Sequence, residues 1–140
     1  MREDLIQAVR SQGLEGDHAL PNQPAPVVSL ELFFEENSDD ASIACNLPDH
    51  PGVDFFYETL KAIRSRPDVQ DVLVEIYDVS EDEWPFAERV YIFTRGSRSD
   101  VADWVRELQP DEIDDGWFFA KPPAAPDVKS GYNVISLWWD

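Results

Sequence analysis

The chain has 140 residues, the size of one ordinary domain, and 43% of them are hydrophobic, which is enough apolar material to fold. Twenty-nine acidic residues against eleven basic ones give a formal net charge of −18, and such a surface repels nucleic acids and anionic membranes. The composition therefore excludes a globally disordered chain and argues against nucleic-acid and membrane partners.

Residues 1–26 predict a short helix followed by a linker or an extended wrap. Leu5 and Val9 can share one face of this helix, and Gly13 would end it. The second half of the segment is rich in proline, glycine and polar residues, a composition typical of connecting segments. The rest of the chain, residues 27–140, predicts a single α+β domain.

The first part of this domain predicts two strands and a helix. Residues 28–33 alternate apolar and polar side chains before becoming more apolar, which favours a strand, and residues 42–46 favour its hairpin partner. Helical spacing of apolar side chains predicts a helix that starts at residue 53 and is ended by Pro67. Its apolar face would contain Val53, Phe56, Leu60 and Ile63.

The second part predicts four more strands and a second helix. Residues 69–79 are the strongest strand prediction, and residues 89–94 would pair with them in antiparallel fashion across a loop of about nine residues. Apolar side chains at i, i+3, i+4 and i+7 predict a helix over 101–108. Short strands at 116–120 and 132–139 would complete the domain.

The predicted element order is ββαββαββ. It favours an α+β fold with a mostly antiparallel sheet and two helices packed on one face, to which the short N-terminal helix would be added. Trp138 and Trp139 lie on the last predicted strand, where neighbouring side chains point to opposite faces. Both can be buried only if both faces of the sheet are covered.

A single cysteine and an acidic N-terminus predict a cytoplasmic location. Cys45 has no second cysteine in the chain with which to form a disulfide, as is usual in a reducing compartment. Glu3 and Asp4 stand where a signal peptide has basic residues. No apolar run approaches the ~18 residues of a transmembrane helix.

The sequence contains no Gly-x-Ser-x-Gly, Walker A, Gly-x-Gly-x-x-Gly or His-Glu-x-x-His motif. Cys45 and His50 are the best candidates for a nucleophile and its base, but a cysteine on a strand is more often a small buried hydrophobe. Acidic runs at 35–40, 78–83 and 111–115 could bind Ca²⁺ or Mg²⁺, although such runs are more typical of solvated loops. We therefore predict a protein that is not an enzyme and has no catalytic residue, metal site or cofactor.

Aromatic residues inside an acidic loop favour a protein-binding surface. Trp84 and Phe86 follow three consecutive acids, and tryptophan and phenylalanine are enriched at protein interfaces. A basic protein partner would be attracted by the negative field. The alternative is that both rings fold back and cover the core. The predicted partner-binding residues are Glu81, Asp82, Glu83, Trp84 and Phe86.

An interaction module of this kind could act by inhibiting its partner. Two other functions are alternatives to it. The alternative is a sensor of a small anion, held where a strand leads into a helix at segment 95–99. Its ligand-binding residues would be Arg95, Ser97, Arg98 and Ser99. Asp100 would oppose an anion there, and Gly-Ser turns are also ordinary helix starts. A hydrolase is the third hypothesis. An open sheet edge could also support a homodimer.

Overall fold

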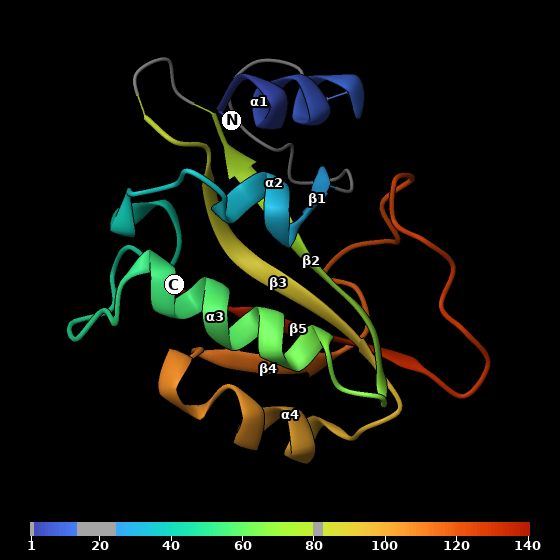
Figure 1. Ribbon diagram of the computed structural model, residues 1–140. Coiled ribbons are helices and arrows are strands. Elements are labelled where there is room, and N and C mark those ends of the chain that lie inside the picture. Colours follow the sequence, from blue (N-terminus) through green and yellow to red (C-terminus); the bar gives the residue numbers. More distant parts are fainter. Residues whose placement is uncertain (1, 14–24, 80–82) are drawn as a thin grey trace.

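The computed structural model describes residues 2–13, 25–79 and 83–140. In these residues, five strands form one antiparallel sheet in the order β1-β2-β3-β5-β4. This arrangement, shown in Figure 1, confirms the predicted α+β class with an antiparallel sheet. In chain order the elements are α1 (Arg2–Ser11), β1 (Val27–Ser29), α2 (Leu30–Phe34), the 3₁₀ helix η1 (Asp40–Ser42), α3 (Val53–Arg64), β2 (Val69–Asp78), β3 (Phe86–Thr94), α4 (Arg98–Trp104), the 3₁₀ helix η2 (Arg106–Leu108), β4 (Glu112–Asp115) and β5 (Asn133–Trp138).

The helices cover one face of the sheet, and the main core lies between them and the strands. The helical spacing predicted for residues 53–63 is confirmed, since all four of its apolar side chains are buried on α3. The N-terminal helix also contributes, because Leu5 and Val9 of α1 are completely buried in the same core. Within the described residues, no helix has the length and apolar character needed to cross a membrane.

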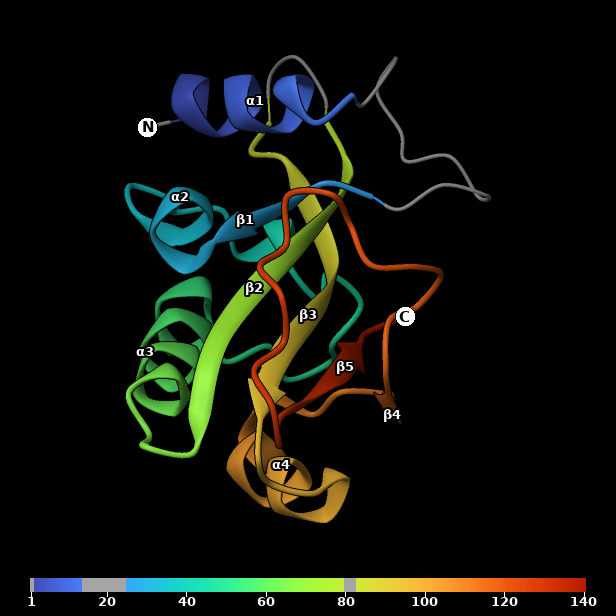
Figure 2. The ribbon, with the colours of Figure 1, turned by 90° about the vertical axis from the view of Figure 1, so that its right-hand side faces the viewer.

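The opposite face is covered by the segment that joins β4 to β5, as Figure 2 shows. Trp117 and Ala125 of this segment pack with Leu73, Tyr91 and other side chains of that face in a second apolar cluster. The side chain of Gln70 fastens the segment to β2, donating to the carbonyl of Asp127 (2.9 Å) and accepting from the N–H of Lys129 (2.9 Å). Because both faces are covered, Trp138 at the end of β5 and Trp139 after it can point to opposite sides of the sheet without either being fully exposed.

Three predicted strands differ from the structure. Residues 28–33 are split, because the hydroxyl of Ser29 accepts the N–H of Leu32 (3.2 Å) and starts α2, leaving only β1 as strand. Residues 42–46 form no strand; η1 precedes an isolated bridge from Ile43 to Ala87. Further along, the strand before β5 is β4 at 112–115 rather than 116–120.

The free edge of β1 is closed by a side chain. The amide of Gln12 donates to the carbonyl of Val27 (2.8 Å) and accepts the N–H of the same residue (2.9 Å). A primary amide has the same donor and acceptor as a peptide group, so Gln12 takes the place of a neighbouring strand. It also connects α1 to the sheet.

Gln12→Ala is expected to lower the free energy of unfolding by about 1–2 kcal/mol, because two partly buried backbone groups lose their partners. Urea denaturation measures the loss, and amide hydrogen exchange should show faster exchange at Val27. Ser11→Ala is the matched control, since Ser11 is exposed and its hydroxyl donates only to the Ala8 carbonyl within α1. Unchanged exchange at Val27 in Gln12→Ala would contradict this role.

Candidate functional site

Three large hydrophobic side chains are exposed in the described part of the chain: Tyr77 (44%), Phe118 (65%) and Phe119 (54%). Tyr77 points away from the helices, because its neighbour Ile76 is buried in the helix-side core. Its ring contacts that of Phe86, with centroids 6.2 Å apart. Phe118 and Phe119 belong to the segment that covers the same face. We call Tyr77, Phe86, Phe118 and Phe119 the aromatic face.

Phe118 lies over a buried ion pair. Its ring centroid is 3.7 Å from the guanidinium carbon of Arg89, and its N–H donates to the hydroxyl of Tyr91 at 3.4 Å. Arg89 pairs with Glu75 (3.4 Å), and their side chains are only 8% and 12% exposed. The hydroxyl of Tyr91 donates to the other oxygen of Glu75 at 2.7 Å. An exposed ring is thus held by a buried polar cluster of Glu75, Arg89 and Tyr91.

Burial dominates the electrostatics of this cluster. It raises the pKa of the Glu75 carboxyl, although the Tyr91 hydrogen bond and the charge of Arg89 both act in the opposite direction. Burial also raises the pKa of the Tyr91 hydroxyl well above its usual range, and the neighbouring carboxylate adds to that effect. Tyr91 therefore stays a hydrogen-bond donor, and Arg89 is the group that compensates the buried negative charge.

The strand register extends this cluster into a row across the sheet. Glu75 of β2 pairs with Arg89 of β3, Arg89 pairs with Trp138 of β5, and Trp138 pairs with Glu112 of β4. Paired side chains share a face. The half-buried Trp138 and the exposed Glu112 therefore lie on the same side of the sheet as Arg89, and Asp114, two residues further along β4, points the same way.

The structure separates the residues of the predicted aromatic loop. Phe86 is half-buried and belongs to the aromatic face through Tyr77, whereas Trp84 packs against the helix-side core. The backbone carbonyl of Glu83 accepts a hydrogen bond from Arg2 of α1 at 2.9 Å. Glu81 and Asp82 lie outside the described residues. Of the two predicted aromatic anchors, Phe86 therefore contacts an exposed ring, that of Tyr77, and Trp84 packs on the core instead.

The predicted anion site at 95–99 begins a helix whose first turn is already filled. Ser97 caps α4, and its hydroxyl accepts the N–H of Asp100 (3.1 Å). The carboxylate of Asp100 in turn accepts the N–H of Ser97 (2.9 Å), and this backbone bond lowers the pKa of Asp100. Ser99 is exposed in the first turn. A carboxylate of the chain itself thus occupies the place where an anion would bind.

The two arginines of that segment point to different partners. Arg95 donates to the carbonyl of Pro67 (3.3 Å) and lies over the ring of Tyr132, with 5.5 Å to its centroid. Arg98 is 4.0 Å from the carboxylate of Asp115, and both side chains are exposed. The sensor hypothesis remains a prediction, and this arrangement does not bring its two cations to one point.

His50 holds the loop before α3. Its Nε2 donates to the carbonyl of Ile43 (2.8 Å), while Nδ1 accepts the N–H of Gly52 (2.9 Å), so both ring nitrogens have backbone partners. Cys45 is exposed rather than buried in a strand. Across the described residues, no three histidine, cysteine, aspartate or glutamate side chains are grouped in a way that could hold a metal ion.

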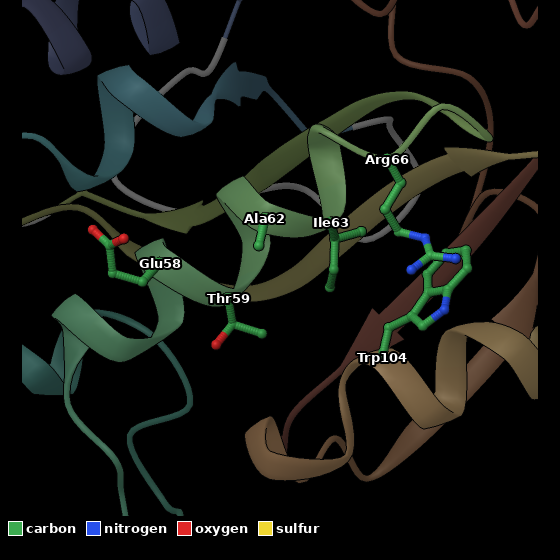
Figure 3. Close-up of a pocket in the computed structure, with 6 residues that line it drawn as sticks. All are labelled: Glu58, Thr59, Ala62, Ile63, Arg66 and Trp104. Carbon is green, nitrogen blue, oxygen red and sulfur yellow. The ribbon is translucent and has the colours of Figure 1, made fainter.

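On the helix side, an open groove of about 430 Å³ runs between α3 and α4 (Figure 3). Its apolar floor includes Ile63 and Ala62, and Arg66 lies over the indole of Trp104 at 4.1 Å to the ring centroid. Arg66 also pairs with Asp68 (3.1 Å). The guanidinium in contact with Trp104 is therefore already paired. The groove is lined by Glu58, Thr59, Ala62, Ile63, Arg66 and Trp104.

Sequence reasoning missed Phe118, Phe119 and Tyr77 as surface residues. The pattern placed the two phenylalanines on a strand, where alternation would bury one of them. The signal that could have identified them is the run of three aromatic residues at 117–119 between Gly116 and a proline-rich stretch, since a run followed by several prolines cannot continue a sheet.

Comparison with known proteins gives a family but no activity. The chain matches the family described as "Uncharacterized protein YfbO family" over residues 1–137. A relative from Escherichia coli (strain K12), named "Uncharacterized protein YfbO", is 36% identical over 128 residues, which cover 91% of each chain. No solved structure matches. The family match runs from α1 into β5.

Proposed function

We propose that this chain, which belongs to the YfbO family, is a cytoplasmic, non-enzymatic module that binds a basic protein. The observation that carries the proposal is the aromatic face on a molecule of net charge −18. Large exposed apolar side chains on one side of a strongly charged molecule are typical of protein-binding surfaces. A phenylalanine side chain gains free energy when it leaves water, so two successive exposed phenylalanines argue for a partner that covers them.

Charge and aromatic groups act together at this surface. Glu112 and Asp114 point to the same side of the sheet as Arg89, over which Phe118 lies, and their carboxylates can pair with lysine or arginine side chains of the partner. The rings of Tyr77, Phe118 and Phe119 offer faces for cation–π contacts with the same side chains. The negative field would speed the encounter, and the rings would supply most of the affinity.

The geometry beneath Phe118 supports a rigid contact. Its ring is fixed over Arg89, and its backbone N–H is fixed to Tyr91. An exposed ring held in place loses little conformational freedom when a partner covers it, which favours binding. The buried cluster therefore has a positioning role in this proposal, and Phe118 and Phe119 make the contact.

The double replacement Phe118→Ala/Phe119→Ala tests the proposal. The tagged protein is used to capture partners from its own cell extract at about 50 mM and about 300 mM NaCl, and the affinity of the purified pair is then measured by calorimetry. We expect a basic partner that is lost at the higher salt, and a loss of affinity of roughly 30-fold or more in the double variant.

Matched variants separate binding from folding. Phe118→Tyr keeps the ring over Arg89 and should bind normally, and Thr59→Ala on α3 lies on the helix side and should have no effect. Phe86→Ala should weaken binding, whereas Trp84→Ala should lower stability instead, because its ring packs on the core. An unchanged affinity in Phe118→Ala/Phe119→Ala, or a partner that is not basic, would overturn the proposal.

A further inference from the structure

The two outer strands of the sheet differ in how their free edges are treated. The edge of β1 is closed by the Gln12 amide, which pairs with both backbone groups of Val27. At the other end of the sheet, α4 contacts β4 and its Arg98 lies 4.0 Å from the carboxylate of Asp115, but in the described residues no hydrogen bond closes the outward backbone groups of β4 in this way. An uncapped edge strand presents a row of unpaired N–H and C=O groups, which is a template for one more strand.

The hydrogen-bond pattern identifies the free groups on β4. Val134 of β5 accepts the N–H of Gly116 (2.7 Å), whereas Trp139 donates to the Glu88 carbonyl next to β3 (2.9 Å). Even-numbered residues of β5 therefore bond toward β4, and odd-numbered ones toward β3. By the alternation of an antiparallel ladder, Ile113 and Asp115 direct their N–H and C=O groups away from β5.

The side chains of β4 determine what can pair with it. Glu112, Asp114 and Asp115 are exposed, and Ile113 packs partly on the helix-side core. In an antiparallel pair of two copies of β4, these acids would oppose one another, and like charges directly opposite each other are destabilising. A segment with lysine or arginine at alternate positions would instead place opposite charges together. The edge therefore favours a basic strand over a second copy.

We propose that β4 accepts an extended basic segment of the partner protein as a sixth strand of the sheet. This inference rests on the proposed function and specifies how the partner binds. In the sheet, β4 and β5 would lie between the added strand and β3, whose Arg89 is covered by Phe118. Side chains of the added strand that share a face with Glu112 and Asp114 would point to the side of the sheet on which the aromatic face lies. Pairing with the β4 backbone would orient the partner, and the rings would add affinity through other parts of the partner that cover the aromatic face.

Asp115→Pro tests the backbone contact, because it removes an outward N–H and leaves the bonds to β5 in place. The control is Asp115→Asn, which removes the charge but keeps the N–H. The probe is a short peptide of alternating lysine and valine, titrated into the full chain and followed by NMR amide exchange. We expect protection of the Ile113 and Asp115 amides, and a loss of affinity of roughly tenfold or more in Asp115→Pro compared with Asp115→Asn.

A version of the peptide whose pairing backbone N–H groups are N-methylated should not bind the unchanged protein. This result does not depend on whether Asp115→Pro folds. Equal binding of the blocked peptide, protection of amides elsewhere, or no binding of the unblocked peptide at millimolar concentration would overturn the inference. If Phe118→Ala/Phe119→Ala weakens the natural partner while Asp115→Pro does not, the proposed function stands and strand addition at β4 is wrong.

Discussion

Replacing Arg89 by methionine is expected to lower the free energy of unfolding by about 3–5 kcal/mol at neutral pH, the usual cost of leaving one member of a buried ion pair without its partner. Methionine can fill much of the space under the Phe118 ring but cannot compensate the carboxylate of Glu75, whose side chain is 12% exposed. Urea denaturation monitored by tryptophan fluorescence would measure the loss.

The loss should depend on pH in a defined direction. Burial raises the pKa of Glu75 in the folded protein, and removal of Arg89 takes away a charge that lowers it. The folded state then binds a proton more tightly than the unfolded state, so stability falls as pH rises from the unfolded pKa through the folded pKa. The destabilisation of Arg89→Met should therefore be smallest in acid and reach its full size above the folded pKa of Glu75.

The double variant Glu75→Gln/Arg89→Met provides the control for this cluster. Glutamine can still accept the Tyr91 hydroxyl but carries no charge, so the double variant should be more stable than Arg89→Met at neutral pH and should lose the pH dependence. Equal stability of the two variants at all pH values would contradict the electrostatic explanation and would leave lost packing under Phe118 as the cause.

Trp139→Ala is expected to lower the free energy of unfolding by about 3–5 kcal/mol, because it leaves a large cavity in the core. Trp139 is 1% exposed, its ring contacts Phe56 edge-on with centroids 5.5 Å apart, and its indole N–H donates to the carbonyl of Leu108 (2.8 Å). Trp139→Phe should cost less, about 1–2 kcal/mol, since it retains most of the volume and loses chiefly the hydrogen bond.

The loss of stability in Trp139→Ala is best compared with that of the same replacement at Trp138. Trp138 is half-buried on the opposite face, so Trp138→Ala should cost only about 1 kcal/mol. Urea denaturation of Trp139→Ala, Trp139→Phe and Trp138→Ala would measure all three effects. If Trp138→Ala were as destabilising as Trp139→Ala, the assignment of the two rings to opposite sides of the sheet would be wrong.

The sequence predicted best where one face of an element is buried along its whole length. This is the case for α3 and β2, whose predicted positions are confirmed, and for the antiparallel partner β3, which begins at Phe86 rather than at residue 89. It predicted poorly where a single side chain decides the backbone path. Ser29 converts an apolar run from strand to helix by one hydrogen bond. Periodicity over a few residues cannot detect such a contact.

The candidate site was only partly accessible to sequence reasoning. An acidic loop with two aromatic residues drew attention to Phe86, which does lie beside Tyr77. The exposed position of Phe118 depends on Arg89 and Tyr91, which are distant in the chain and brought beneath it by strand pairing. Such contacts follow from the order of strands in the sheet, which local patterns do not encode.

The position of β5 has a consequence for synthesis on the ribosome. It lies between β3 and β4, although it follows both of them in the chain. Residues 133–138 must therefore leave the exit tunnel before β3 and β4 can belong to one sheet, and until then β3 has an unpaired side. The parts of the chain that leave the ribosome first would fold first, and β5 would insert between β3 and β4 last. Until then, rapid completion of folding or binding of chaperones would have to protect the unpaired side of β3.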